Sequence, residues 1–213
     1  MNKDKLSDSH KLIYIVRRFT QCYWRLRSLK RITNLSEDSR ILDFGGGPGV
    51  FSNFMQELSY KNVSNYDPSP KSATQAKQFI PAFKHYTNID DFKKIKFNII
   101  TSYFIHAYMD NKSSVYSQLA DNLEVGGKLI IEINNNNSIL NKLFKDTNDS
   151  WDIKKNDIPR SLKLKKIYRG SIDWCIYEYE RNGVLKNIIK NIVSVVLRFF
   201  GSTQSVVHVY EKI

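Results

Sequence analysis

Four glycines lie within the five residues 45–49, and this turn restricts the fold of the chain more than any other feature. The apolar run before it predicts a short buried strand at 40–44, and the apolar periodicity after it predicts a helix at 50–58. A strand that enters a helix through glycines brings backbone N–H groups close to a ligand, beside the positive end of the helix dipole. The turn therefore predicts a site for an anion or a nucleotide-like ligand.

The spacing of the glycines separates three kinds of cofactor site. A P-loop requires Lys and then Ser or Thr at a fixed place, and neither follows Gly49 at that spacing. A dinucleotide site of the form GxGxxG would place its third glycine at Val50. The spacing present is GxGxG, with an acid, Asp43, two residues before the first glycine.

Strand-like and helix-like segments alternate through the middle of the chain. Further strands are expected at 61–66, 83–86, 97–102 and 128–133, and further helices at 72–79 and 113–123. Apolar strands that alternate with helices are typical of a parallel sheet covered on both faces. We therefore expect an α/β fold.

The two ends of the chain complete this sheet. A helix is expected at 11–31 before the first strand. After the core, the expected elements are a short helix at 138–144, a half-exposed strand at 173–181, an amphipathic helix at 184–200 and a last strand at 205–211. We expect one domain over 1–213, with an N-terminal helical cap at 1–38, a cofactor-binding core at 39–133 and a C-terminal sheet end at 134–213.

The segment Ile41–Gly49 resembles the first motif of the class I S-adenosylmethionine-dependent methyltransferases. Three later positions match that family in order. Asp67 is the acid that ends the second strand, and Asn88-Ile89 lies at the adenine contact, where the family commonly has Asp. The alternative is a register shifted by one residue, in which Asp90 takes the place of that Asp. Residues 123–131 resemble the turn into the fifth strand, with Val125 in place of a proline. The resemblance implies a Rossmann-like, doubly wound, mostly parallel sheet of seven strands with an antiparallel last strand.

The resemblance also implies S-adenosyl-L-methionine as the cofactor. This molecule carries an ammonium and a sulfonium but no pyrophosphate, so an acid at the turn is favourable. In the family, the carboxylate that corresponds to Asp67 accepts both ribose hydroxyls. The candidate cofactor-binding residues are Asp43, Gly45, Gly46, Gly47, Gly49, Asp67, Pro68, Asn88, Ile89 and Ser102.

His106 is the candidate catalytic residue. A hydroxyl acceptor benefits from a positioned base, and many small-molecule members of the family carry a histidine near this point, after the fourth strand. The alternative is a histidine that only packs or hydrogen-bonds. Tyr14 and Tyr103 are further candidates for the acceptor site.

The sequence excludes some acceptors. Thr101–Phe104 is not the Asn/Asp-Pro-Pro-Tyr of family members that methylate exocyclic amines, and neither Cys22 nor Cys175 ends a strand suited to C5 methylation of a pyrimidine. We expect a small-molecule or sugar- or lipid-linked acceptor, methylated at oxygen or nitrogen by direct in-line transfer. The alternatives are a catalytically silent cofactor-binding or scaffold protein on the same fold and a basic RNA-directed methyltransferase.

The net charge of +12 belongs to the two ends of the chain. Residues 1–40 hold 10 Lys and Arg against 4 Asp and Glu, and residues 151–213 hold 12 against 6, whereas the middle is neutral. These basic residues are scattered without a recognised RNA-binding module, which argues against a nucleic-acid partner. We expect helix 11–31 to form part of an acceptor pocket that favours an anionic acceptor. Its alternative is a solvated helix.

The amphipathic helix expected at 184–200 suggests peripheral contact with an anionic membrane. The alternative is a helix that covers the sheet or a partner copy. Isolated cysteines and the lack of a Cys/His cluster argue against a metal site, and the polar first residues do not resemble a signal peptide. We expect a cytoplasmic protein, with possible membrane association on the cytoplasmic face; the sequence leaves its oligomeric state open.

Overall fold

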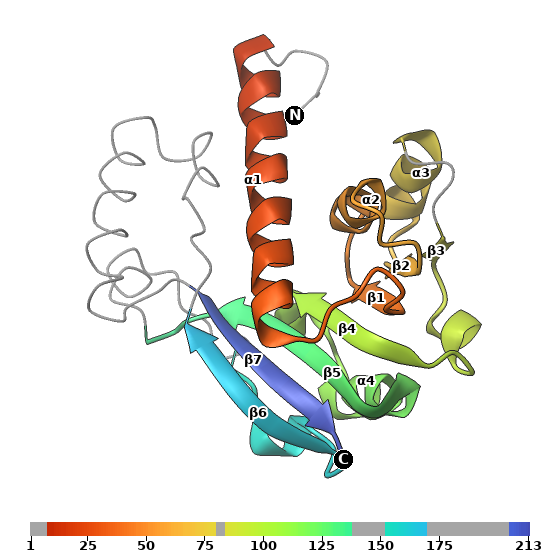
Figure 1. Cartoon of the computed structure of the whole chain (residues 1–213), viewed down its shortest axis with the longest axis vertical. Coiled ribbons are helices and arrows are strands. Elements are labelled where there is room, and N and C mark those ends of the chain that lie inside the picture. Colours follow the sequence, from red (N-terminus) through yellow and green to blue (C-terminus); the bar gives the residue numbers. More distant parts are fainter. Residues whose placement is uncertain (1–7, 80–83, 138–151, 170–204) are drawn as a thin grey trace.

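The structure is a computed structural model that describes residues 8–79, 84–137, 152–169 and 205–213 (Figure 1). The helix expected at 138–144, the strand expected at 173–181 and the amphipathic helix expected at 184–200 lie outside the described residues. Within the described residues, no helix is long and apolar enough to cross a membrane.

The described strands form one seven-stranded sheet in the order β3-β2-β1-β4-β5-β7-β6. Neighbours from β3 to β5 pair in parallel, and β7 runs antiparallel to both β5 and β6. This confirms the predicted α/β class and the antiparallel last strand. The strands are β1 (Ile41–Phe44), β2 (Val63–Tyr66), β3 (His85–Tyr86), β4 (Phe97–Tyr103), β5 (Leu123–Asn134), β6 (Leu162–Arg169) and β7 (Ser205–Lys212).

The strand order reverses beside β1. The chain moves from β1 outward through β2 to β3 and then returns to the other side of β1 as β4. In open α/β sheets, ligands bind outside the carboxyl ends of the strands at such a reversal of strand order. The glycine turn follows β1 directly and therefore lies at this reversal.

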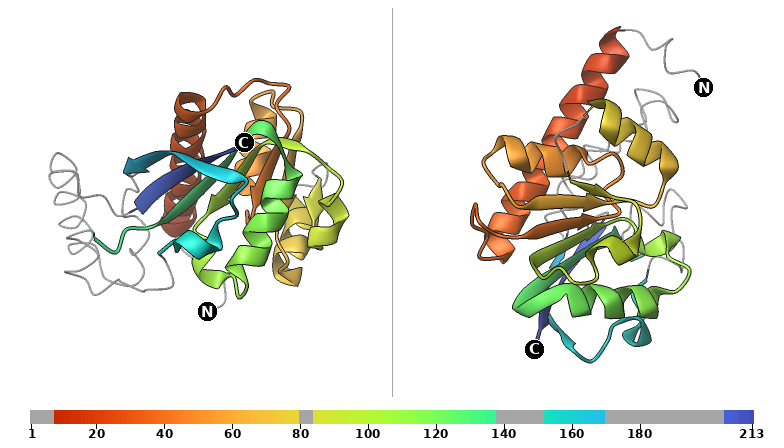
Figure 2. Two further views of the ribbon diagram at one scale, coloured as in Figure 1. Left: turned by 90° about the horizontal axis from the view of Figure 1, so that it is seen from below. Right: turned by 90° about the vertical axis from the view of Figure 1, so that its right-hand side faces the viewer.

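Helices cover both faces of the sheet. Figure 2 shows α2 and α3 on one side of the strands and α4 on the other. Two apolar clusters fill these layers: one joins α1 and α2 to the sheet, and the other joins α4 to it. The helices are α1 (Asp8–Ile32), α2 (Val50–Glu57), α3 (Pro70–Phe79) and α4 (Lys112–Asn122), and the short 3₁₀ helices are η2 (Ile89–Phe92), η3 (His106–Tyr108) and η5 (Lys155–Asp157).

The α1 helix confirms the helix expected at 11–31. Cys22, Leu26 and Leu29 recur at helical spacing and are all buried, because they pack into the cluster shared with α2 and the sheet. The ring of Phe19 meets that of Phe54 on α2 edge-on, with centroids 5.4 Å apart. One apolar stripe therefore attaches α1 to the sheet.

Two stretches of the sheet differ from the sequence interpretation. The strand β6 lies where no strand was expected, because its lysine-rich sequence, with only Leu162 buried among the side chains described on it, does not look like a buried strand. Lysines are typical of sheet edges, where they hinder pairing with other chains. Residues 124–127, expected as a turn, belong to β5, where the register against β4 shifts and Gly126 has φ +75°.

Truncation of the α1 stripe tests the docking of this helix. Leu29 has no exposed surface, so Leu29→Ala should lower the free energy of unfolding by about 2–5 kcal/mol, since it removes buried methyl groups and leaves a cavity. Urea unfolding followed by circular dichroism measures the change. The exposed Arg31 is the matched control, and Arg31→Ala should alter stability by less than about 0.5 kcal/mol. Equal effects of the two variants would contradict the docking.

Candidate functional site

The glycine turn is fastened to the end of β2. The N–H groups of Gly45 and Gly46 both donate to the carbonyl of Tyr66, at 2.8 and 3.2 Å. Gly45, Gly47 and Gly49 have φ values of +77°, +58° and +82°, a region that side chains disfavour and glycine adopts freely. Gly49 is also the N-cap of α2. The turn therefore connects β1 to the amino end of α2 in a conformation that requires glycine.

Asp43 lies beneath this turn and is almost completely buried. Its carboxylate accepts hydrogen bonds from the hydroxyls of Thr101, at 2.8 Å, and Ser52, at 3.4 Å. Burial raises the pKa of Asp43, while the guanidinium of Arg25 and the two hydroxyl donors lower it. The carboxylate therefore links β1, β4 and α2 directly under the turn.

Gly46 closes the turn over Asp43. A Cβ atom at position 46 would lie 2.3 Å from Oδ2 of Asp43 and 2.1 Å from Oδ1 of Asn65. Both oxygens belong to buried side chains with little room to move. Position 46 therefore accepts only glycine without a rearrangement of the turn.

Asp67 lies at the end of β2 and contacts the same turn. Its Oδ2 accepts the N–H of Gly47 at 2.9 Å, and its Oδ1 accepts the N–H of Ser69 at 3.0 Å. Each carboxylate oxygen has a second lone pair for a ligand hydroxyl. The structure therefore brings the predicted ribose-binding acid to the glycine turn, and the exposed Pro68 follows it.

The residues at this edge fit S-adenosyl-L-methionine. A Cβ built at Gly47 meets no atom within 4 Å, so the turn faces open space there. Ser102, near the end of β4, is buried, and its hydroxyl has no hydrogen-bond partner among the described residues. Two carboxylates near exposed glycine backbone suit a ligand that carries hydroxyls and positive charge.

Asn88 and Ile89 follow β3 at the same edge of the sheet. The N–H of Asp67 donates to the carbonyl of Tyr86, two residues before Asn88, at 3.1 Å. Asn88 is exposed, and its Oδ1 caps η2 by accepting the N–H of Asp90 at 3.0 Å. Ile89 is half-buried against the α4-side core. They lie at the same end of the strands as Asp67, and the adenine contact stays a prediction; the side-chain carbonyl of Asn88 already accepts one hydrogen bond.

The geometry of His106 does not fit the predicted general base. The ring is fully buried; its Nδ1 lies 2.7 Å from the hydroxyl of Tyr116, and its Nε2 lies 3.2 Å from the carbonyl of Asp152. A carbonyl only accepts, so Nε2 carries the hydrogen and Nδ1 accepts from Tyr116. Burial lowers the pKa of His106. Both nitrogens are therefore occupied inside the protein, and His106 joins η3 to α4 instead of facing an acceptor.

A second group of polar residues lies between α1 and the ends of β4 and β5. Arg25 lies over the ring of Tyr103, 4.3 Å from its centroid, and shares with Tyr103 and Glu132 a cavity of about 10 Å³. Glu132 is buried and accepts the hydroxyl of Ser205 at 2.8 Å. The sequence interpretation did not single out Glu132, although an acid inside the apolar run 129–133 was a visible signal.

The backbone beside this group has an uncommon conformation. Phe104, directly after β4, has φ +60°, and its N–H donates to the carbonyl of Glu132 at 2.8 Å. Strained backbone conformations of this kind cluster at active sites, ligand clamps and switch regions. Ile105 follows it and fills the space above Gly45, where a Cβ would lie 2.7 Å from its Cγ1.

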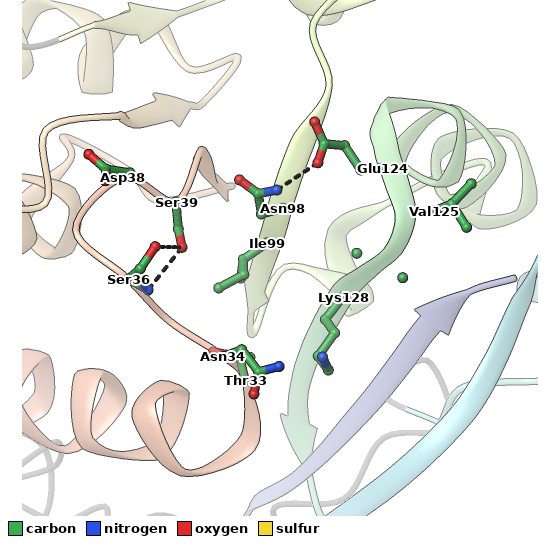
Figure 3. Close-up of a pocket in the computed structure, with 12 residues that line it drawn as sticks. Thr33, Asn34, Ser36, Asp38, Ser39, Asn98, Ile99, Glu124, Val125 and Lys128 are labelled. Carbon is green, nitrogen blue, oxygen red and sulfur yellow. Dashed lines mark hydrogen bonds between the residues drawn. The ribbon is translucent and has the colours of Figure 1, made fainter.

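A larger pocket lies at the opposite edge of the sheet, where β4 and β5 begin. It measures about 450 Å³ and is lined by residues 33–39 after α1, the start of β4 and residues 124–128 of β5. Figure 3 shows that Ser36 pairs with Ser39 there and that Asn98 pairs with Glu124, at 3.1 and 2.7 Å. These polar side chains form hydrogen bonds with one another. The pocket is separate from the glycine turn.

Comparison with known proteins identifies relatives of this fold. A family model described as a methyltransferase domain matches residues 16–169. The chain is similar to the crystal structure of MccD protein, with 17% identity, a TM-score of 0.59 and coverage of 90% of this chain and 97% of that chain. No curated protein sequence matches it.

Two further solved structures share the fold. A putative sarcosine dimethylglycine methyltransferase from Galdieria sulphuraria has 11% identity and a TM-score of 0.59, with coverage of 91% of this chain and 86% of that one. A SAM dependent methyltransferase from Archaeoglobus fulgidus has 13% identity and a TM-score of 0.56, with coverage of 92% and 94%.

Substitution of Gly46 tests the packing of the turn. Gly46→Ala should weaken binding of the demethylated cofactor, S-adenosylhomocysteine, by at least about tenfold, because the new methyl group must displace Asp43 or Asn65. Isothermal titration calorimetry measures the affinity. The matched control is Gly126→Ala, since Gly126 lies at the far edge of the sheet with open space around it. Gly126 has φ +75°, whereas Gly46 does not have a positive φ, so backbone strain alone would affect the control more than Gly46→Ala. A Gly46→Ala variant with unchanged affinity would show that the turn does not need glycine at this position.

Substitution of His106 tests its structural position. The neutral ring is preferred in the folded state, so protonation favours the unfolded chain and stability falls as the pH drops below the usual His pKa of about 6.5. His106→Gln should lower the free energy of unfolding by about 1–3 kcal/mol at pH 7.5 and by less at pH 5.5. Urea unfolding at both pH values measures this. A His106→Gln variant that kept its stability but lost methyl transfer would support the prediction that His106 is a catalytic base.

Proposed function

The chain belongs to the methyltransferase-domain family and is an S-adenosylmethionine-dependent methyltransferase, and from this premise we propose that it methylates a small-molecule acceptor at oxygen or nitrogen by direct in-line transfer. The observation that carries the proposal is the pair of carboxylates, Asp43 and Asp67, held against the glycine turn. The same proposal extends to a sugar- or lipid-linked small acceptor.

The cofactor site of the proposal uses the residues around the turn. Asp67 would accept the ribose hydroxyls, and the backbone at Gly47 would lie against the ligand, because open space adjoins that residue. Asp43 would support the turn from below and contribute negative charge toward the ammonium and sulfonium. The Asn88–Ile89 segment would border the adenine, since it follows β3 at the same edge.

The cofactor supplies an electrophilic methyl group on a sulfonium when it is bound. The protein's task is then to align the acceptor with that methyl group and to exclude water, which can account for about 7–11 kcal/mol of a barrier. An acceptor that is already a nucleophile, such as a neutral amine, needs no strong base. This agrees with the buried position of His106, which leaves no general base at that residue.

We place the acceptor between α1 and the ends of β4 and β5. Tyr103 lies at the end of β4, Glu132 lies near the end of β5, and Arg25 approaches both from α1. The cavity that they share has room for about one water molecule, so an acceptor would require α1 to move aside. The positive charge of Arg25 lowers the pKa of Asp43, so the carboxylate of Asp43 already balances part of the charge that Arg25 would offer to an anionic acceptor. The expected preference for an anionic acceptor thus gains no support from Arg25, and the suggested membrane contact through 184–200 lies outside the described residues.

A likeness to one solved structure is in keeping with a small-molecule acceptor. The Galdieria sulphuraria protein is described as a putative sarcosine dimethylglycine methyltransferase, and sarcosine and dimethylglycine are both small amines. The fold is shared at 11% identity only, so the comparison suggests the size of an acceptor and not its identity.

Removal of the Asp67 carboxylate tests the cofactor site. Asp67→Ala should weaken S-adenosylhomocysteine binding by at least about 100-fold, because two charge-assisted hydrogen bonds of about 1.5–3 kcal/mol each are lost. Titration calorimetry measures this at pH 8. Asp38→Ala, which removes an exposed acid at the far edge of the sheet, is the matched control and should bind normally.

The acceptor class is tested with the unaltered protein. S-adenosylhomocysteine production should rise with a panel of small amines and hydroxyl compounds and stay at background with RNA. Transfer to RNA alone would overturn the proposed acceptor class, and absence of cofactor binding would overturn the proposed site.

A further inference from the structure

Asn65 connects the glycine turn to β3 through a single amide. It lies in β2, fully buried, in register with Asp43 on β1 and His85 on β3. Its Nδ2 lies 2.8 Å from the carbonyl oxygen of Gly47 and 2.9 Å from Nδ1 of His85. One side-chain nitrogen therefore spans three neighbouring segments at the carboxyl edge of the sheet.

These two contacts fix the protonation of His85. The carbonyl of Gly47 only accepts, so the amide must direct an N–H toward it. The second N–H of the same nitrogen points to Nδ1 of His85, which must accept and therefore carries no hydrogen. The ring is neutral, with its hydrogen on Nε2, a buried atom that has no hydrogen-bond partner among the described residues.

The orientation described leaves Oδ1 of Asn65 without a partner among the described residues, and the opposite orientation is less favourable still. Rotation would direct Oδ1 of Asn65 at the carbonyl oxygen of Gly47, where two acceptors would repel each other. A protonated His85 would direct a second N–H at Nδ2, where two donors would meet. Protonation of the ring therefore cannot occur without loss of a hydrogen bond in this bridge.

Asn65 makes one of the two hydrogen bonds that Gly47 forms with the described residues. The N–H of Gly47 donates to Asp67 at 2.9 Å, and its carbonyl accepts from Asn65. This residue has φ +58° and faces the open side of the turn. The position of its peptide groups thus depends on the proposed ribose acid at one end and on Asn65 at the other.

The charges around His85 come from two other elements. Burial lowers the pKa of His85, Asp67 at the end of β2 raises it, and Lys77 on α3 lowers it. Because burial outweighs the carboxylate, the ring stays neutral at neutral pH, in agreement with the hydrogen-bond geometry.

We propose that Asn65 and His85 are positioning residues for cofactor binding: the neutral ring of His85 holds the Asn65 amide on the carbonyl of Gly47, and protonation of the ring releases the turn and weakens binding. The inference rests on the proposed cofactor site at this turn. It adds a pH dependence of cofactor affinity that the residues of the glycine turn themselves do not predict.

Calorimetric titration with S-adenosylhomocysteine between pH 8.0 and pH 5.5 tests the proposal. The affinity of the unaltered protein should fall on acidification, by at most about tenfold per pH unit, as expected for one linked proton. His85→Asn retains an acceptor near the position of Nδ1 but does not titrate. It should bind within about threefold of the unaltered protein at pH 8.0 and show a flat profile.

A variant at the other end of the bridge should act differently. Asn65→Ala should bind about tenfold more weakly at pH 8.0 and lose the acid-dependent fall, because no amide remains for His85 to hold. Thermal unfolding of each variant identifies those that do not fold. A profile that stays acid-sensitive in His85→Asn would assign the dependence to another group, such as Asp43, and overturn the proposal.

Nuclear magnetic resonance of the protein without ligand separates this inference from the proposed function. The ¹⁵N shifts of the His85 ring should show the hydrogen on Nε2 at pH 8, and titration should move the amide signal of Gly47 together with the ring. A hydrogen on Nδ1, or a Gly47 signal that ignores the titration, would overturn the bridge. Failure of the unaltered protein to bind S-adenosylhomocysteine at pH 8.0, with both NMR results as expected, would instead overturn the proposed site.

Discussion

The buried carboxylate of Asp43 is the constraint on which the arrangement of the site depends. An ionised group without partners would be costly at this depth, and the fold supplies them from three directions: Thr101 on β4, Ser52 on α2 and Arg25 on α1. Each partner belongs to a different element. The carboxylate therefore specifies how those elements meet, and the glycine turn lies over it because Gly46 has no side chain to displace it.

The sequence predicted the architecture well because the signals for it are local. Apolar runs bounded by turns located β1, β2 and β4, and the glycine spacing located the turn and the start of α2. The one described strand that escaped prediction, β6, is held by pairing with β7 and exposes its lysines, so the stabilising contacts come from elsewhere in the chain. Edge strands carry weak local signals for this reason.

The site was predicted less completely, because the role of each side chain depends on partners that are distant in the sequence. Asp43 and Asp67 could be found by spacing, whereas the position of His106 depends on Tyr116 and on the carbonyl of Asp152. The sequence placed His106 after β4 but gave no sign that both ring nitrogens were occupied. Asn65 offered a visible signal, a polar residue inside a buried strand, but its partners Gly47 and His85 lie on other segments.

The place of β7 in the sheet restricts the order in which the chain can assemble. β7 follows β6 in the sequence but lies between β5 and β6 in space, so β6 has no neighbour in the described sheet until β7 has been made. The ammonium of Lys212 at the end of β7 also donates to the carbonyls of Ala120 and Leu123, at 2.6 and 3.1 Å, where α4 meets β5. During synthesis on the ribosome, the parallel half of the sheet can form early, whereas the outer half must wait for its last strand. Such long-range pairing slows folding, and until β7 is in place the edge of β5 stays unpaired, which makes a growing chain prone to aggregate.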